Sequence, residues 1–173
     1  MGVLAEEELY RELEELSRLP ALMRNVLGEE TQTRVRELAR KYAPSQRDWA
    51  VVGSGVTRAA ADEIRIKLAE LCYKSIATDQ IEDKKHIDLS SEPLTLVLTA
   101  GLSQVALRDA VKEVAIFRSH KSVPIVVCSE DFEAFGPYAA GVISVPKASQ
   151  CASVLLNVVV GHLWGYFCAL AID

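Results

Sequence analysis

WAVVGSGVTRAAADEIRIKLAELC, residues 49–72, sets the fold class of this 173-residue chain. Its apolar start, Trp49 to Val52, predicts a buried strand, and Gly53, Ser54 and Gly55 follow as a turn. Beyond the turn, apolar side chains recur at the spacing of a helix: Ala60, Ile64, Leu68 and Leu71. A strand, a glycine turn and a helix in this order open an α/β unit, in which ligands usually bind above the carboxyl end of the strand.

Four further apolar segments predict strands, over residues 75–78, 94–98, 123–128 and 141–145. A helix is expected over residues 103–119, where apolar residues again follow helical spacing. Apolar strands that alternate with helices indicate a parallel sheet with both faces covered. The sequence therefore predicts an α/β fold, a three-layer α/β/α sandwich of the flavodoxin-like kind around a five-stranded parallel sheet.

Two helices are expected before the sheet. Leucines at helical spacing predict the first helix over residues 4–27, with an interruption at Pro20. The second helix is expected over residues 29–42. We therefore expect residues 1–45 to form a helical connector and residues 46–173 to form the α/β domain.

The C-terminal segment, residues 148–172, contains no formally charged side chain and is long enough to span a bilayer. Membrane insertion penalises the polar side chains that are spread through it, which are Ser149, Gln150, Ser153, Asn157 and His162. A helix buried between the sheet and a partner subunit explains the segment better, so no membrane association is expected. On this apolar helix His162 is expected to be a core histidine.

The composition indicates one soluble globular domain, with 50% hydrophobic and 25% charged residues. The net charge of −5 argues against nucleic acid as a partner. No secretion signal is visible, so a cytoplasmic location is expected. The four cysteines have no CxxC spacing and are expected to be buried free thiols: Cys72, Cys128, Cys151 and Cys168. The sequence implies no metal and no cofactor.

The predicted helix after the glycine turn carries Glu63, Lys67 and Glu70 on one face. The simplest interpretation is a solvated surface with an ion pair between Glu63 and Lys67. The alternative is a catalytic set, because a lysine can hold a sugar carbonyl as a charged clamp or a Schiff base and a glutamate can move a proton between adjacent carbons. With His86, whose imidazole suits the opening of a sugar ring, the set fits aldose–ketose isomerisation.

The glycine turn has a second possible use, in binding a dinucleotide. Arg58 stands where the dinucleotide fingerprint has a third Gly or Ala, and Asp79 stands roughly where the ribose-binding acid would be. The match lacks a glycine, so a nicotinamide-binding role is a distant alternative. A possible phosphate loop runs from Thr99 to Gln104, where Ser103 is more simply explained as a helix N-cap.

The spacing of these residues resembles that of the second sugar isomerase (SIS) half of glucosamine-6-phosphate synthase, the glutamine–fructose-6-phosphate transaminase. That family has a Gly-Arg-Gly turn, then a glutamate, a lysine four residues later and a second glutamate three residues after that. Here the turn at residues 53–55 leads to Glu63, Lys67 and Glu70. The family's histidine follows at the separation that His86 has here. The resemblance covers residues 9–173.

The resemblance implies a role for each of these residues. Lys67 would hold the carbonyl of an open-chain ketose of the fructose 6-phosphate type, Glu70 would transfer the proton between C1 and C2, and Glu63 would support it. His86 would open the ring, and in the family it serves the neighbouring subunit's site, so a homodimer is implied. The candidate substrate-binding residues are Gly53, Ser54, Gly55, Thr99 and Ser103.

The chain also departs from the family pattern. The family's Tyr-Pro after the turn is Arg58–Ala59 here, and its His-Gly-Pro is His86–Ile87–Asp88. The first SIS half, the amidotransferase domain and the C-terminal tail with another active-site lysine have no counterpart. We therefore expect a half-module of a longer transaminase, in amino sugar metabolism, that needs a partner and is inactive alone. The alternative is a SIS module that binds or senses a phosphosugar without turnover.

Overall fold

The computed structural model describes residues 6–45, 48–84 and 93–173. Its centre is a five-stranded sheet in the order β2-β1-β3-β4-β5, and every pair of neighbouring strands is parallel. The strands are β1 (Trp49–Gly53), β2 (Ile76–Asp79), β3 (Leu94–Leu98), β4 (Val123–Ser129) and β5 (Gly141–Val145). The predicted five-stranded parallel sheet is confirmed, with β2 beginning and ending one residue later than its apolar pattern indicated.

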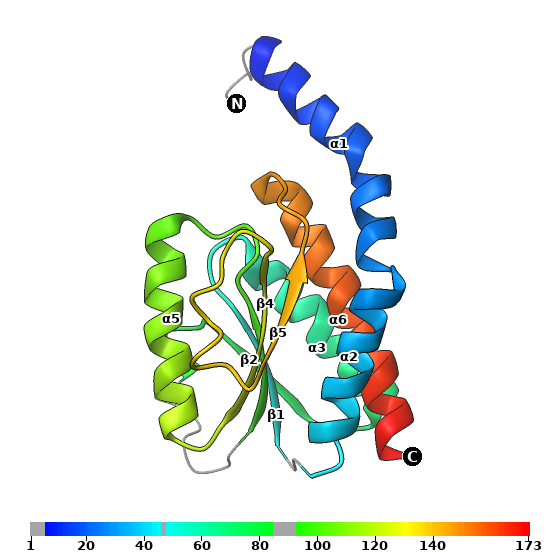
Figure 1. Cartoon of the computed structure of the whole chain (residues 1–173), viewed down its shortest axis with the longest axis vertical. Coiled ribbons are helices and arrows are strands. Elements are labelled where there is room, and N and C mark those ends of the chain that lie inside the picture. Colours follow the sequence, from blue (N-terminus) through cyan, green and yellow to red (C-terminus); the bar gives the residue numbers. More distant parts are fainter. Residues whose placement is uncertain (1–5, 46–47, 85–92) are drawn as a thin grey trace.

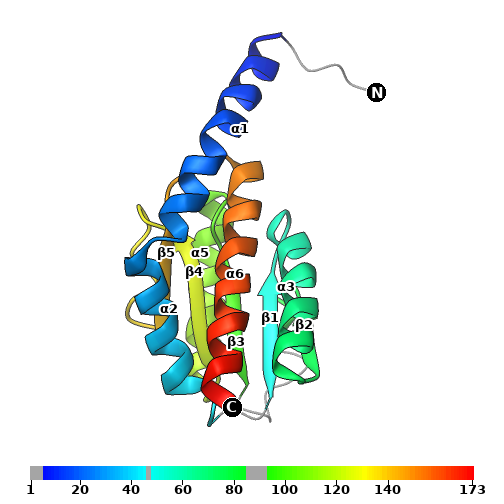
Figure 2. The same cartoon turned by 90° about the vertical axis from the view of Figure 1, so that its right-hand side faces the viewer.

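Helices cover both faces of this sheet (Figure 1, Figure 2). α2 (Glu29–Tyr42), α3 (Thr57–Cys72) and α6 (Gln150–Ile172) pack on one face, and α5 (Gln104–Ser119) packs on the other. From β1 the chain continues to β2 on one side, whereas β3 leads away to β4 on the other side. The point where the strand order reverses therefore lies between β1 and β3, which is where open α/β sheets bind ligands.

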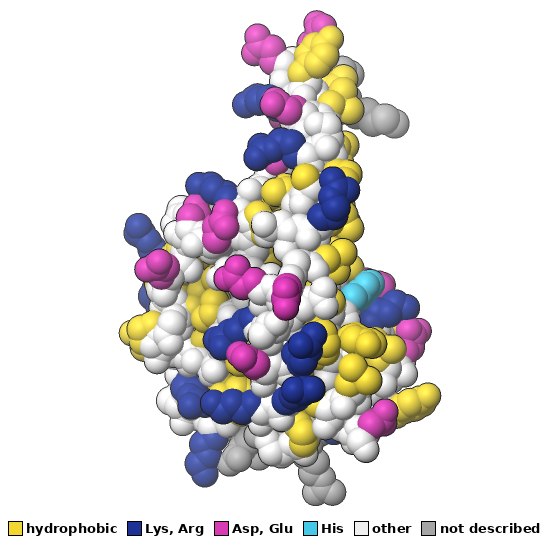
Figure 3. All heavy atoms as spheres, turned by 45° about the vertical axis from the view of Figure 1, so that its right-hand side comes forward, with side chains coloured by type: hydrophobic (Ala, Val, Ile, Leu, Met, Phe, Trp, Pro, Cys, Tyr) yellow, Lys and Arg dark blue, Asp and Glu magenta, His cyan; other side chains and the backbone are white. Residues whose placement is uncertain are grey.

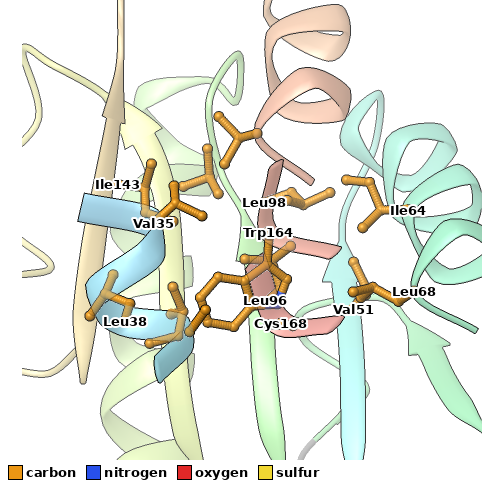
Figure 4. Packing of buried hydrophobic residues seen from close by; sticks show 14 of the residues in the cluster. Val35, Leu38, Val51, Ile64, Leu68, Leu96, Leu98, Ile143, Trp164 and Cys168 are labelled. Carbon is orange, nitrogen blue, oxygen red and sulfur yellow. The ribbon is translucent and has the colours of Figure 1, made fainter. Parts of the chain in front are cut away.

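The larger core cluster is built around Trp164 of α6, which is 1% exposed. Figure 4 shows it between side chains of α2 on one side and of β1 and α3 on the other. Gly161 lets α3 approach α6 closely, because a Cβ at this position would lie 2.3 Å from Cγ1 of Ile64. The sheet face, α2, α3 and α6 thus share one packed interior.

α6 is the one helix of the described chain that is long and apolar enough to cross a membrane, by length and composition. In its most apolar stretch, 44% of the residues are buried inside the protein. Its buried Asn157 donates hydrogen bonds to the carbonyl oxygens of Ala100, at 2.9 Å, and Ser153, at 2.8 Å. One side of α6 therefore packs in the core against the sheet, as predicted from the polar side chains in this segment.

α1 (Glu6–Val26) runs continuously through Pro20, so the predicted interruption is wrong. A proline inside a helix removes one backbone hydrogen bond and bends the axis, and Figure 1 shows α1 bending between its projecting and packed halves. The turn after Pro20 stays helical because Leu22 and Met23 pack on the core. The half before it projects beyond the sheet with exposed leucines, namely Leu9, Leu13 and Leu16.

Three of the four cysteines are buried, whereas Cys151 is exposed, so its predicted burial is wrong. Cys151 lies in the first turn of α6, at a position that faces solvent. Burial raises the pKa of the Cys72 thiol to about 11 and that of the Cys128 thiol to about 11. Burial raises the pKa of Cys168 as well. The buried thiols are therefore protonated near neutral pH.

We expect one thiol per chain to react rapidly with an aromatic disulfide reagent at about pH 8, because the thiolate is the reactive form. That thiol is Cys151, so Cys151→Ser should remove the fast phase measured by absorbance. Cys72, Cys128 and Cys168 should react only after unfolding in denaturant. A fast phase that persists in Cys151→Ser would contradict the burial of the other three.

Candidate functional site

The turn after β1 is held by one buried hydroxyl group, that of Thr57, which is 0% exposed. Its Oγ1 accepts a hydrogen bond from the backbone N of Ser54, at 3.0 Å, and lies 3.0 Å from the carbonyl oxygen of Leu98. Gly53 lies so close that a Cβ there would be 2.5 Å from the carbonyl oxygen of Thr57. Gly55 has a φ of +56°, in the left-handed region that favours glycine. The turn is thus fixed to α3 and β3.

The Ser54 hydroxyl group points towards the segment after β2. Its Oγ donates to the carboxylate of Glu82 and accepts from the backbone N of Ile81, at 3.0 Å. These groups border a hollow of about 320 Å³ between the turn and α5, whose lining includes the carboxyl groups of Asp109 and Glu113. None of the described lining residues is lysine or arginine. Carboxylates accept hydrogen bonds from hydroxyl groups and repel phosphate, so this lining favours the hydroxyl groups of a sugar.

The loop after β3 uses its hydroxyl groups for structure. Thr99 is fully buried, and its Oγ1 donates to the carbonyl oxygen of Val127 at 2.8 Å. Ser103 caps α5 and accepts a hydrogen bond from the backbone N of Ala106 at 3.3 Å, as the simpler interpretation predicted. The loop backbone is also tied to α6, through the bond from Asn157 to Ala100.

Glu63, Lys67 and Glu70 belong to α3, on which Nζ of Lys67 lies 2.9 Å from Oε2 of Glu70. The hydrogen bond and the charge of Glu70, with a smaller effect of Glu63, raise the pKa of Lys67 above its ordinary value. Lys67 is therefore an ammonium ion near neutral pH. The side chains of Glu63, Lys67 and Glu70 are 43%, 38% and 59% exposed, so a ligand can reach all three.

One of these residues, Glu63, lies beside His162 of α6. Its Nε2 is 3.5 Å from Oε1 of Glu63, and its side chain is 45% exposed. The prediction of a core histidine is therefore wrong. α6 is apolar around most of its circumference, so the periodicity of the sequence gives no sign of which side faces solvent. Only the packing of α3 against α6 reveals that this imidazole meets Glu63.

The chain is similar in sequence to glutamine–fructose-6-phosphate aminotransferases. No family model matches it. A glutamine–fructose-6-phosphate aminotransferase of Thermus thermophilus is 31% identical over 169 residues, which are 95% of this chain and 27% of that protein. The corresponding enzyme of Mycolicibacterium smegmatis is 28% identical over 166 residues, which are 91% of this chain and 26% of that protein. The chain thus spans about a quarter of the length of these curated relatives.

Solved structures agree with this assignment. The C-terminal domain of the Francisella tularensis aminotransferase superposes on 98% of this chain with a TM-score of 0.84, at 14% identity and over 47% of its own length. The sugar isomerase domain of the RpiR transcription factor of Sphaerobacter thermophilus covers 93% of this chain and 94% of its own, with a TM-score of 0.66 at 15% identity. The chain has the fold of a sugar isomerase (SIS) domain. Its sequence resembles the glutamine–fructose-6-phosphate aminotransferases.

In this SIS domain the predicted site residues form two separate groups. α3 runs back along the sheet from the glycine turn, so Glu63 and Lys67 lie about 9 and 15 Å further along its axis than Thr57. Glu63, Lys67 and Glu70 therefore lie on the outer surface of the SIS domain, where Glu63 is 3.5 Å from His162. The other group is at the carboxyl end of the sheet and contains Gly53, Ser54, Gly55, Thr99 and Ser103. His86 lies outside the described residues.

The other candidate binding residues of the SIS domain form contacts within the protein. Arg58 and Asp79, the residues of the nicotinamide alternative, form an ion pair at 3.8 Å. A larger open hollow of about 760 Å³ lies between α2 and the edge strand β5, where Nε of Arg34 donates to the carbonyl oxygen of Val142 at 3.1 Å. Within residues 6–45, 48–84 and 93–173, no group of three His, Cys, Asp or Glu side chains is placed to hold a metal ion.

Proposed function

We propose that this SIS domain is the phosphosugar isomerase half-module of a glutamine-dependent hexosephosphate aminotransferase. Its reaction is the conversion of an open-chain ketose of the fructose 6-phosphate type into the aldose. The observation that supports it most is the accessible face of α3, on which Lys67 pairs with Glu70 at 2.9 Å and Glu63 lies 3.5 Å from His162. The resemblance to the aminotransferases supplies the substrate class.

The isomerisation needs one base that serves two adjacent carbons. The carboxylate of Glu70 removes a proton from C1 of the ketose while O2 gains a proton, which gives an enediol. Glu70 then returns the proton to C2 while O1 loses its proton, and the C1 aldehyde results. The carboxylate of Glu63 stabilises the positive charge of Lys67. His86 is the proposed ring-opening residue of this scheme.

The raised pKa of Lys67 favours a charged clamp over a Schiff base. An imine forms from the neutral amine, and amines that do this chemistry have depressed pKa values. Here the hydrogen bond to Glu70 raises the pKa and keeps Lys67 charged. An ammonium group stabilises the negative charge that develops on the carbonyl oxygen as the C1 proton leaves. Lys67 is therefore the proposed electrostatic stabiliser of the enediol.

The proposed site is open on its outer side, because Glu63, Lys67, Glu70 and His162 are all partly exposed. A partner that covers this face would exclude water from the reacting sugar. A first SIS half or a second copy of the chain is the proposed partner, and the homodimer and the cytoplasmic location both belong to this proposal.

Replacing Lys67 by alanine should weaken the binding of fructose 6-phosphate at least tenfold, because a charge-assisted contact contributes about 1.5–3 kcal/mol. Titration calorimetry on the chain measures the dissociation constant. Lys112→Ala is the matched control, since Lys112 forms the same kind of exposed pair with Asp109, at 2.8 Å on α5. Equal affinity of the wild type and Lys67→Ala would contradict a site on α3.

Borohydride treatment in the presence of fructose 6-phosphate separates the two roles of Lys67. A charged clamp leaves no adduct, whereas an imine is reduced to a stable amine that mass spectrometry finds on Lys67. An adduct on Lys67 that disappears in Lys67→Ala would replace the clamp by the Schiff base. The absence of any binding to the wild type would remove the phosphosugar site altogether.

The second candidate function is a SIS module that binds a phosphosugar without turnover. The Sphaerobacter thermophilus neighbour is a transcription factor with a sugar isomerase domain, and a Vibrio vulnificus NanR protein complexed with ManNAc-6P superposes with a TM-score of 0.61 over 91% of this chain. A charged Lys67 suits binding as well as catalysis. Sugar binding without exchange of the C1 proton with solvent, measured by NMR, would favour this module.

A further inference from the structure

β5 lies at one edge of the sheet, and its outer edge forms one wall of the larger hollow, of about 760 Å³, beside α2. Two hydrogen bonds show which backbone groups of β5 face this hollow. The carbonyl oxygen of Val145 accepts from the backbone N of Glu130, so it points towards the end of β4. The carbonyl oxygen of Val142 instead accepts from Nε of Arg34 on α2. Because successive residues of a strand direct their backbone groups to opposite sides, those of Val142 and Ser144 face the hollow.

Most of these edge groups have no partner among the described residues. Within that part of the chain, the one hydrogen bond on the outer edge of β5 is that from Arg34 to Val142. The N–H of Val142, and both the N–H and the carbonyl oxygen of the exposed Ser144, are left for solvent or for another strand. These two residues are about 7 Å apart along the strand, which is also the repeat of the edge groups on an added strand. Such a row of groups is a template for pairing with another chain.

The opposite wall of the hollow is α2, which lies alongside β5 (Figure 1, Figure 2). Some domains that recognise peptides bind them in an extended conformation, as an additional strand on the exposed edge of a sheet. The lining on the α2 side is polar and includes Thr31 and Thr33. The hollow therefore suits an extended peptide better than an amphipathic helix, which would need an apolar groove.

The charge of the hollow favours a cationic partner. Its described lining has a net charge of −3, from the guanidinium of Arg34 and the carboxylates of Glu29, Glu30, Glu37 and Glu130. No described side chain forms an ion pair with Glu29, Glu30 or Glu37. Figure 3 looks onto this side of the molecule and shows acidic side chains around its middle. The hollow therefore attracts a basic peptide and repels nucleic acid, an acidic peptide and the same hollow of a second copy.

We propose that the hollow between α2 and β5 binds an extended segment of another protein, rich in lysine or arginine, which joins the sheet as a strand beside β5. Main-chain hydrogen bonds to Val142 and Ser144 hold this segment. Alternate side chains of a strand point to the same face, so every second residue of the segment faces α2. Lysine or arginine at these positions meets the carboxylates of Glu30 and Glu37.

This surface is separate from the proposed sugar site. α6 lies between α2 and α3, and Lys67 belongs to α3 (Figure 2). The inference therefore does not depend on the proposed function. Lys67→Ala should bind the basic peptide with unchanged affinity, and fructose 6-phosphate should not compete with it.

Fluorescence anisotropy with a labelled peptide in which lysine and valine alternate tests the charge of the hollow. A peptide of alternating glutamate and valine is the control and should not bind. Glu30→Gln and Glu37→Gln should each weaken binding of the lysine peptide about two- to fivefold, as expected for exposed ion pairs. Arg34→Ala should tighten it by a similar factor, because it removes the positive charge of the lining and frees the carbonyl oxygen of Val142. Glu133→Gln, an exposed carboxylate outside the hollow, should leave the affinity unchanged.

Methylation of the peptide backbone distinguishes strand pairing from simple attraction of charges. One version of the lysine peptide is methylated on the lysine nitrogens and another on the valine nitrogens. Alternate N–H groups of a strand point to opposite edges, so only one version keeps the N–H groups that face β5. The two affinities should therefore differ about tenfold, through the loss of main-chain hydrogen bonds.

Ser144→Pro tests the same pairing from the side of the protein. It removes an N–H that faces the hollow and not β4, so the sheet and its circular dichroism spectrum should persist while binding weakens about tenfold. Ser144→Ala should bind like the wild type, because the added strand uses only the backbone of Ser144.

Three results would overturn the proposal. The first is a lysine peptide that does not bind, or that binds no more tightly than the glutamate peptide. The second is equal affinity of the two methylated peptides, a measurement that needs only the wild-type chain. The third is a dimer, seen by sedimentation equilibrium, that Ser144→Pro separates into monomers, since β5 would then be a contact between copies of this chain.

Discussion

Replacing Glu70 by glutamine is expected to lower the isomerisation rate by roughly 10²- to 10⁴-fold, which is the usual contribution of a general base. Glutamine keeps the size of the side chain and its hydrogen bond to Lys67, but it cannot take the C1 proton. The affinity for fructose 6-phosphate should change little. The rate is measured in a chimaera in which this chain replaces the matching segment of the Thermus thermophilus aminotransferase, which is 31% identical to it.

Two further carboxylates of α3 provide comparison variants for Glu70→Gln. Asp62→Asn removes the same charge from the same helix, where Asp62 pairs with Arg58 at 3.2 Å, and it should leave the rate unchanged. Glu63→Gln should reduce the rate less than Glu70→Gln does, since its proposed role is supporting. A Glu70→Gln chimaera that isomerises at the wild-type rate would contradict the proton transfer by Glu70. A wild-type chimaera that binds the sugar but is inactive would favour the binding module.

Much of the fold could be predicted because the sheet is buried on both faces. The residues of β1 and β3 are all buried, so their apolar runs stand out from the polar segments around them. The stretch around Gly53 also predicted that the strands are parallel, since a glycine turn between a strand and a helix is typical of parallel sheets. The predicted bounds of α2, β3 and β5 agree with the observed ones.

The two misplaced residues of α6 share one cause. Whether Cys151 and His162 face the core or the solvent depends on which side of α6 meets α3, and an apolar helix carries no periodic signal for this. Pro20 was expected to interrupt α1 on the basis of local helix propensity. This propensity does not include the packing that holds the following turn. The face of α3 was found from its spacing, but its distance from the carboxyl end of the sheet follows only from the fold.

In the glycine turn after β1, a methyl group should lower the free energy of unfolding far more at Gly53 than at Gly55. Gly53→Ala is expected to lower the free energy of unfolding by about 3 kcal/mol, through overpacking and loss of the helix-start contacts. The new Cβ would lie 2.5 Å from the carbonyl oxygen of Thr57 and 2.8 Å from its Oγ1. Oγ1 of Thr57 cannot move away without breaking its hydrogen bonds with Ser54 and Leu98.

Gly55→Ala tests a different physical effect in the same turn. A Cβ at Gly55 would meet nothing within 4 Å, so the only penalty is the positive φ, which amounts to about 1–2 kcal/mol for an L-residue. Gly136→Ala is the control, because its nearest contact, 3.5 Å from the carbonyl oxygen of Glu133, is an ordinary one. Denaturant unfolding at equilibrium measures all three variants. If Gly53→Ala is no less stable than Gly55→Ala, the turn relaxes, and Thr57 does not hold it against α3.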